Sequence, residues 1–264
     1  MRRTGFGSSG WSFLAWVGLL LMIVSIIATP WTAPFGNGLR PFQPESPANV
    51  VVIDAGHGGQ DSGAIEGNLS EKDLTLDVAQ RLDRMLQGQG VPTMMTRASD
   101  TYISLAERAA MTNRLPDCMM VSIHFNDVKK SGSSGVETYY ADHQIFAEKP
   151  LISWLPFLEK ASTPHPNPES QKLADAVQQA IVLKTNATNR GTKAEQFFVI
   201  ANVRHPAVLV EAGFLSNKDD AARLGDPEYR ERIALAISDG VVAYRNSLRQ
   251  GKTTFAVSSL TPGE

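Results

Sequence analysis

The sequence predicts an α/β fold: a single three-layer domain with a mostly parallel twisted sheet flanked by helices, preceded by an N-terminal membrane helix. From residue 49 onward, short apolar runs alternate with stretches that have helical spacing. The runs are continuously apolar, which is typical of parallel strands buried on both faces. With 42% hydrophobic and 20% charged residues, the chain can also bury a sizeable core.

The first two strands and the first helix of the domain follow from local patterns. Val50–Ala55 is a continuous apolar strand, and Val91–Thr96 is the next strand. Between them, Ser70 occupies an N-cap position, with Asp73 three residues later, and opens a helix. The apolar face of this helix repeats at helical spacing and comprises Leu74, Val78, Leu82, Met85 and Leu86.

The middle of the domain continues the alternation. Leu105–Arg114 has the pattern of a short helix, which Pro116 ends. Two strands follow, at Cys118–Phe125 and Val136–Ala141. Cys118 is the only cysteine, so no internal disulfide can form. Its apolar context indicates a small buried residue rather than a nucleophile.

The last part of the domain adds two helices and two strands. Leu173–Leu183 has helical spacing, and Phe197–Ala201 and Ala207–Ala212 have the composition of strands. Asp226 is an N-cap followed by Pro227, which suits the first turn of a helix. The long helix that it opens has one apolar face, formed by Ile233, Ile237, Val241 and Tyr244.

The segments around the domain differ from it in composition. Residues 1–28 contain two arginines and then an apolar run that ends at Ala28 and has about the minimum length for a membrane-spanning helix. We interpret this segment as a signal anchor or a cleaved signal peptide, with a buried helix as the remaining interpretation. Residues 29–48 are rich in proline and glycine and form a linker. The globular domain then spans 49–250, and 251–264 is a frayed tail.

Charge and the N-terminus together constrain the partners and the location. The chain has 25 basic and 27 acidic side chains, a formal net charge of −2. A weakly acidic chain lacks the basic face that nucleic-acid binding needs, so we expect no nucleic-acid partner. The two arginines before the apolar run should stay on the cytoplasmic side of the membrane. The domain that follows the run should then lie on the other side, in the cell envelope. It would be anchored to the cytoplasmic membrane, facing the periplasm or the outside, or secreted if the signal is cleaved.

Two histidines and two glutamates occur where a metal site could form. His57 follows the first strand, and Glu71 opens the first helix. His124 and Glu211 end two later strands. The carboxyl ends of parallel strands share one crevice, so these side chains should converge. A catalytic zinc uses three protein ligands, leaves one position for water and needs a base for that water's proton. Two histidines and one carboxylate could therefore bind Zn²⁺, with the other carboxylate as the base.

Each of these residues also has a structural interpretation when it is taken singly. A histidine after a strand is commonly a hydrogen-bonded structural residue, and a glutamate at a helix start commonly complements the helix dipole. Competing chemistries fit the sequence less well. The glycines around His57 match neither phosphate-binding pattern, and the domain has no G-x-S-x-G nucleophile elbow. His205, just before the strand that ends in Glu211, could reach the mouth of such a site.

Four segments carry a family resemblance that extends over about residues 50–248. They are Asp54-Ala55-Gly56-His57-Gly58-Gly59, Glu71-Lys72-Asp73-Leu74, Val121-Ser122-Ile123-His124-Phe125-Asn126 and Val210-Glu211-Ala212-Gly213-Phe214. Together they resemble the zinc-dependent N-acetylmuramoyl-L-alanine amidases, cell-wall hydrolases of amidase type 3. The resemblance implies that His57, Glu71 and His124 bind Zn²⁺ and that Glu211 is the catalytic base. Weaker matches include Gly135-Val136-Glu137 and Arg190-Gly191.

The resemblance also implies a reaction. It is hydrolysis of the amide between N-acetylmuramic acid and L-alanine in peptidoglycan, as part of cell-wall remodelling or turnover. Zinc-activated water would be the nucleophile, and Glu211 would take its proton and return it to the leaving amine. Asn126 could bind substrate or orient a ligand. Two other classes remain open: a different zinc peptidase or deacetylase of envelope polymers, and a non-catalytic peptidoglycan-binding protein.

One long segment interrupts the alternation of strands and helices. Residues 142–169 have an apolar content of their own, which is common in lids and binding loops. Regulated members of the resembled family carry an inserted helical segment here, which occludes the zinc until an activator protein moves it. Glu148 and Glu159 could supply a blocking ligand. An activator acting on this insert is therefore an expected partner, beside peptidoglycan and the membrane. A substrate-contacting loop or a packing excursion is the alternative.

Overall fold

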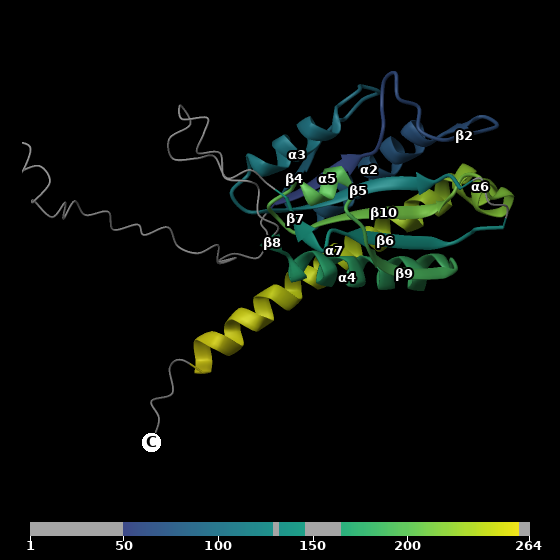
Figure 1. Ribbon diagram of the computed structural model, residues 1–264. Helices are drawn as coiled ribbons and strands as arrows, with labels where there is room; N and C mark the ends of the chain where they lie inside the picture. The colour runs from purple at the N-terminus through teal and green to yellow at the C-terminus, as the bar shows by residue number, and fades with distance from the viewer. Residues whose placement is uncertain (1–49, 129–131, 146–164, 259–264) are drawn as a thin grey trace, which may run out of the picture. The chain divides into compact units, whose positions relative to one another are not determined.

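The computed structural model describes residues 50–128, 132–145 and 165–258 (Figure 1). The chain divides into two units, Met1–Gln43 and Pro44–Glu264, and every described residue belongs to the second unit. The expected membrane helix, the linker and most of the expected insert lie outside the described residues. Within the described ranges, no helix combines the length with the apolar character needed to cross a membrane.

The core of the second unit is a six-stranded sheet in the order β4-β1-β5-β10-β6-β9 (Figure 1). Its strands are β1 (Val50–Ala55), β4 (Thr93–Met95), β5 (Cys118–Asn126), β6 (Val136–Tyr140), β9 (Asn189–Ala194) and β10 (Ala207–Phe214). Neighbouring strands are parallel except for β6, which is antiparallel to β10. The predicted α/β fold with a mostly parallel sheet is therefore confirmed.

Helices and two short strand pairs complete the unit. The helices are α2 (Glu71–Gly88), α3 (Leu105–Asn113), α4 (Pro168–Thr185), α5 (Phe198–Ala201), α6 (Lys218–Gly225) and α7 (Pro227–Ser258). The short pairs, both antiparallel, are β2 (Ile65–Glu66) with β3 (Leu69–Ser70), and β7 (His143–Gln144) with β8 (His165–Pro166). The first pair leads directly into α2, and so sets where that helix begins.

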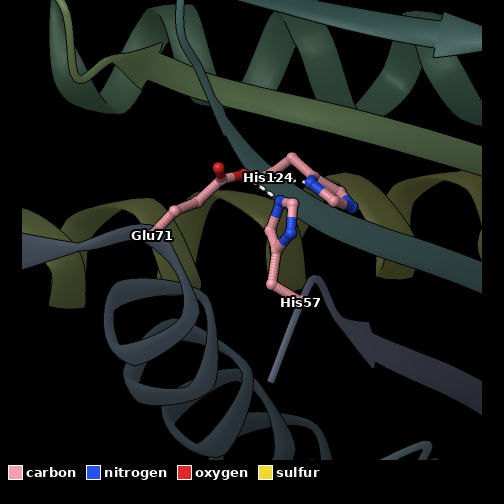
Figure 2. Close-up of side chains that lie close together, drawn as sticks. All are labelled: His57, Glu71 and His124. Carbon is pink, nitrogen blue, oxygen red and sulfur yellow. Dashed lines mark hydrogen bonds and ion pairs between the residues drawn. The ribbon is translucent and has the colours of Figure 1, made fainter. Parts of the chain in front are cut away.

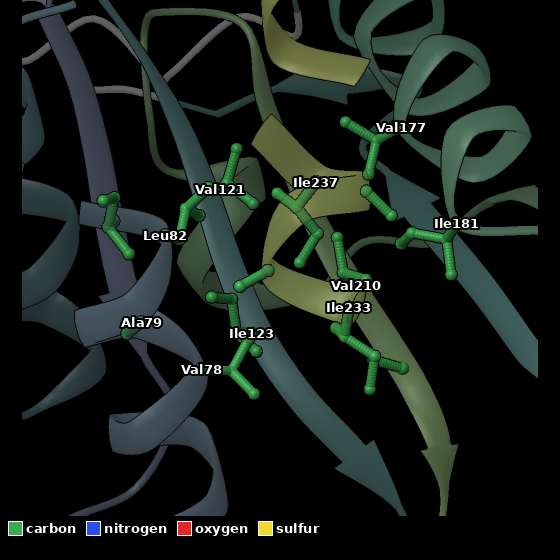
Figure 3. Close-up of a cluster of buried hydrophobic side chains, with 14 of the residues drawn as sticks. Val78, Ala79, Leu82, Val121, Ile123, Val177, Ile181, Val210, Ile233 and Ile237 are labelled. Atoms are coloured by element: carbon green, nitrogen blue, oxygen red, sulfur yellow. The ribbon is translucent and has the colours of Figure 1, made fainter. Parts of the chain in front are cut away.

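Helices cover both faces of the sheet because successive strand residues point to opposite faces. On one face, Val121 and Ile123 of β5 pack in a core with α2, α4 and α7, to which Leu82, Val177 and Ile237 belong (Figure 3). On the other face, Met120 of the same strand belongs to a second, smaller core. The smaller core draws on α3 and α5 and includes Ala109, Val199, Ile200 and Leu209. The predicted three layers follow from this alternation.

One predicted strand is wrong. Residues 197–201 form no strand, because Phe198–Ala201 is helix α5. A four-residue apolar run has no periodicity that separates a strand from one helical turn, and burial against α3 favours the turn. The strand that pairs with β6 is instead Asn189–Ala194, whose polar composition did not predict it.

The ends of two helices refine the expectations. Ser70 is the N-cap residue of α2, but its side chain makes no capping bond and donates to the carbonyl of Ser62. Asp226 does cap α7, because Oδ1 accepts from the Glu228 amide at 2.9 Å. Helix α7 continues to Ser258, so the first part of the expected tail is helical and the remainder lies outside the described residues. One glycine, Gly251, costs only about 1 kcal/mol and does not end the helix.

Candidate metal centre and active site

His57 lies in the loop that follows β1, at the carboxyl edge of the sheet. Its backbone has a φ of 59°, in the left-handed region, and its carbonyl accepts a hydrogen bond from Nη2 of Arg108 at 2.6 Å. Nδ1 of the ring is 2.9 Å from Oδ2 of Asp61. The loop is therefore held at both its backbone and its ring, and Nε2 is left facing the interior of the site.

Glu71 is the first residue of α2 and uses both carboxylate oxygens. Oε2 accepts from the amide of Ala64 at 2.9 Å, and Oε1 accepts from the amide of Phe125 at 3.1 Å. Its side chain is only 6% exposed. A glutamate that merely complemented a helix dipole would be solvated, so this one has another role.

The two histidines meet at a single oxygen of Glu71 (Figure 2). Oε1 lies 3.0 Å from Nε2 of His57 and 3.0 Å from Nδ1 of His124, and the ring centroids are 4.9 Å apart. The ligand atoms of the three residues all lie within 4.8 Å of one another. Two imidazoles and one carboxylate are a donor set that suits zinc and leaves a position open. The residues therefore fit the metal that the sequence predicts.

Two glycines make this convergence sterically feasible. A Cβ at Gly56 would lie 2.4 Å from the His124 ring. A Cβ at Gly63 would lie 2.5 Å from Oε2 of Glu71 and 2.7 Å from Cδ2 of His57. No side chain larger than hydrogen fits at either position. The three ligand side chains can therefore lie this close together only because both positions are glycine.

The charges of the cluster stabilise each other. Burial would raise the pKa of Glu71, but hydrogen bonds from His124 and His57 outweigh it and hold that pKa far below its ordinary value. Burial lowers the pKa of His57, but contacts with Glu71 and Asp61 outweigh this and raise it. Glu71 is thus an anion throughout the range in which enzymes work, as a metal ligand must be.

Glu211 lies on β10, directly beside His124 of β5 in the register of the sheet. Its Oε2 is buried and has no hydrogen-bond partner among the residues that the structure describes. Burial, and then the negative charges of Glu71 and Glu137, raise its pKa well above the ordinary value. A carboxyl group in this setting readily accepts a proton, which is what a general base needs.

All four residues line one pocket of about 970 Å³. Its walls are mixed. Exposed apolar side chains such as Tyr102 and Phe198 line it, and so do the cations Arg190 and Lys193. This volume is at the upper end of the range for ligand-binding pockets. Asn126 also lines the pocket, and its Nδ2 donates to Oε1 of Glu137 at 2.9 Å.

Comparison with known proteins identifies the family. The model of the family described as N-acetylmuramoyl-L-alanine amidase matches residues 51–243. The chain belongs to this amidase family. It is 34% identical over 195 residues to the N-acetylmuramoyl-L-alanine amidase LytC of Bacillus subtilis, covering 74% of this chain and 35% of LytC.

Solved structures of amidases share the fold. An N-acetylmuramoyl-L-alanine amidase from Clostridium difficile 630 superposes with a TM-score of 0.64 at 32% identity, over 76% of this chain and 99% of that one. The CwlD amidase from Clostridioides difficile, in complex with the GerS lipoprotein, superposes with a TM-score of 0.64 at 26% identity, over 75% of this chain and 99% of that one. As a member of this family, the protein is an amidase of peptidoglycan.

One residue suggested for the amidase site lies elsewhere. His205 precedes the amino end of β10, whereas Glu211 lies toward its carboxyl end. His205 is buried at 7% exposure, its carbonyl accepts from Gln144, and it does not line the pocket. The suggestion that it reaches the mouth of the site is therefore wrong. A strand of this length separates its two ends by more than a side chain can span.

The amidase site also contains polar residues to which the sequence assigned no role. Asp61 contacts His57, and its four-residue spacing from that histidine was the available signal. Glu137 and Arg190 appeared only as weak family matches, and Lys193 carried no signal. Their roles depend on contacts between strands far apart in the sequence.

Proposed function

We propose that this amidase hydrolyses the bond between the lactyl group of N-acetylmuramic acid and L-alanine in peptidoglycan, with Zn²⁺ as its cofactor. His57, Glu71 and His124 are the proposed zinc ligands, and Glu211 is the proposed base. The observation that carries the proposal is the convergence of Nε2 of His57 and Nδ1 of His124 on one oxygen of Glu71, beside Glu211.

The proposed reaction divides between metal and protein. A zinc ion bound to this donor set would activate a water molecule and polarise the scissile carbonyl. Glu211 would accept the proton of the attacking water and pass it to the departing amide nitrogen. A new C–O bond replaces the C–N bond, so the products are a lactyl carboxylate and a stem peptide with a free L-alanine amine. The raised pKa of Glu211 suits it to hold that proton between the two steps.

Asp61 is the proposed positioning residue for His57. Oδ2 of Asp61 accepts from Nδ1 of the ring and so favours the tautomer in which Nε2, the atom that faces Glu71, offers its lone pair to a metal. The same contact fixes the plane of the ring. Asn126 remains a proposed substrate contact, because it lines the pocket beside the base and already donates to Glu137.

The decisive experiment combines elemental analysis with mass spectrometry of peptidoglycan digests. We expect about one zinc per chain, free stem peptides that begin with L-alanine, and glycan without peptides. Cuts within the stem peptide, or loss of acetyl groups, would instead indicate the alternative zinc peptidase or deacetylase. A zinc-loaded protein that binds peptidoglycan and releases no product would indicate inhibition by residues 142–169 if deletion of residues 146–166 restores cleavage, and the non-catalytic alternative if it does not.

The location and the regulation of the enzyme are also proposals. We infer action in the cell envelope, with residues 1–28 as membrane anchor or signal and 142–169 as a segment on which an activator acts. The relative CwlD is a precedent for a protein partner, since its structure contains the GerS lipoprotein. Deletion of residues 146–166 should raise activity if the segment is inhibitory. Unchanged or lower activity would contradict that role.

A further inference from the structure

Two cations on the edge strand β9 lie in the pocket beside the proposed base. Arg190 and Lys193 line the pocket, and their side chains are 33% and 39% exposed. The third basic side chain of the lining, Arg108, is buried at 2% exposure in an ion pair with Asp54. Among the described residues, Arg190 and Lys193 are therefore the solvent-accessible cations of this pocket.

One buried carboxylate holds both cations in place. Oε2 of Glu137, a residue 2% exposed, accepts from Nε of Arg190 at 2.8 Å and from Nζ of Lys193 at 2.5 Å. Its other oxygen accepts from Asn126 at 2.9 Å and from the Tyr139 hydroxyl at 2.7 Å. Glu137 thus has four donors; burial raises its pKa, but the hydrogen bonds from Lys193, Tyr139 and Arg190 outweigh this and hold the pKa below the ordinary value.

Arg190, Lys193 and Glu137 together carry a net positive charge, and Arg190 keeps hydrogen-bond donors that Glu137 does not use. Two cations share one anion, and Arg190 uses only Nε toward Glu137. Its guanidinium carbon lies 4.9 Å from the centre of the Phe214 ring, which fixes the plane of the group. Neither terminal nitrogen of Arg190 makes a hydrogen bond to the described part of the chain. A planar pair of free donors is the geometry that recognises a carboxylate.

The distance of Arg190 and Lys193 from Glu211 indicates which carboxylate of the substrate these two cations could bind. Glu137 is the cross-strand partner of Glu211, and β9 is the next strand beyond β6. Two strand spacings correspond to roughly 10 Å. A stem peptide that starts at the scissile amide covers at most about 3.6 Å per residue. The length of the arginine side chain accounts for the rest of the distance between β9 and a group on the second residue of the stem peptide.

We propose that Arg190, assisted by Lys193, binds a free carboxylate on the second residue of the stem peptide, and that Glu137 is the positioning residue of this subsite. The inference rests on the proposed amidase function and deepens it. In peptidoglycan the second residue is a glutamate linked through its side chain, whose α-carboxyl is either free or amidated. The subsite would favour the free acid, because an amide offers a weaker acceptor and no charge.

The test compares two substrates and three variants. The substrates are N-acetylmuramoyl-L-alanyl-γ-D-glutamyl-L-lysine and the same compound with its glutamate α-carboxyl amidated, so that the γ-carboxyl is linked in both, and the readout is the ratio of their kcat/KM values. We expect the zinc-loaded wild type to favour the free acid by about tenfold, as for one charge-assisted hydrogen bond. Arg190→Gln should bring the ratio close to one, and Arg190→Lys should keep part of the preference. Lys172→Gln, an exposed change outside the pocket, should leave the ratio unchanged.

The outcomes separate the subsite from the reaction. Equal cleavage of both substrates by the wild type would overturn the subsite and leave the amidase proposal intact. A preference that survives in Arg190→Gln would also overturn it. Cleavage of neither substrate, together with no stem peptide released from intact peptidoglycan by either the full chain or the variant that lacks residues 146–166, would refute the proposed function itself. Zinc content and melting temperature of Arg190→Gln show that a change in ratio does not come from misfolding, and the rescue by lysine provides a second check.

Discussion

His124 of β5 and Glu211 of β10 are register partners on neighbouring parallel strands. Neighbouring strands lie about 4.8 Å apart, and paired residues point to the same face of the sheet. A proposed metal ligand and the proposed base are therefore held together by backbone hydrogen bonds between two buried strands. Their distance does not depend on flexible loops, which is the preorganisation that catalysis requires.

Because Glu211 is the proposed base and not a proposed metal ligand, its substitution should affect proton transfer and leave metal binding unchanged. Glu211→Gln should retain the zinc content of the wild type, because the three proposed ligands are untouched. Turnover should fall by at least about a hundredfold, since an amide cannot accept the proton. Elemental analysis and product formation measure the two effects. Glu228→Gln, an exposed change, is the control. Wild-type turnover in Glu211→Gln would refute the role of the residue.

The same substitution should stabilise the metal-free protein at high pH. Burial and two neighbouring anions raise the folded-state pKa of Glu211, whereas an unfolded glutamate titrates near about 4.3. Folding thus favours the protonated form, and stability is lost as pH rises above about 4.3. With a chelator present, Glu211→Gln should melt at a higher temperature than the wild type at pH 8, and at nearly the same temperature at pH 4.

Thermal unfolding monitored by circular dichroism measures the difference. Glu66→Gln, at an exposed position, should match the wild type at both pH values. A melting temperature of Glu211→Gln that is equal to or below the wild-type value at pH 8 would contradict the prediction. It would show that the ionised carboxylate of Glu211 does not destabilise the folded protein.

Two glycines with similar backbones provide a matched steric test. Gly63 has a φ of 62° and Gly67 a φ of 57°, so alanine costs roughly 1–2 kcal/mol of backbone strain at each. A Cβ at Gly63 would overlap Glu71 and His57, whereas a Cβ at Gly67 meets nothing within 4 Å. Gly63→Ala should therefore weaken zinc binding strongly, and Gly67→Ala should not. Competition with a chromogenic chelator measures both, and equal affinities would argue against the proposed ligand set.

Asp61 offers a test of the contact behind the metal ligands. Asp61→Ala removes the acceptor of Nδ1 of His57, so the ring loses its fixed plane and its tautomer. Loss of such a partner typically lowers metal affinity about 10–100-fold. Zinc titration of the metal-free protein measures the effect, with Asp239→Asn as the control at a surface ion pair. Unchanged affinity would mean that Glu71 alone orients His57.

The fold class and the convergence of the four principal residues could be predicted because their signals are local. Buried parallel strands are continuously apolar; His57 follows one of them, and His124 and Glu211 lie in the carboxyl halves of two others. Glu71 opens a helix whose apolar spacing is plain. The edge strand Asn189–Ala194 could not be predicted, because it needs only one partner and no apolar side chains. The prediction of a strand at α5 is wrong because four apolar residues are too few to show a helical or a strand periodicity.

By itself the sequence determined the positions of the core strands and helices other than β9 and α5, the fold that they build and the side chains near the carboxyl edge of the sheet. Only the tertiary structure decided that Oε1 of Glu71 lies between the two histidines and that a buried oxygen of Glu211 has no partner in the described ranges. It also decided that Arg190 and Lys193 share Glu137. The physical reason is that apolar periodicity depends on residues that are close together in the sequence. The distances, burial and charge balance at a site depend instead on segments that are far apart in the sequence and meet only in the folded chain.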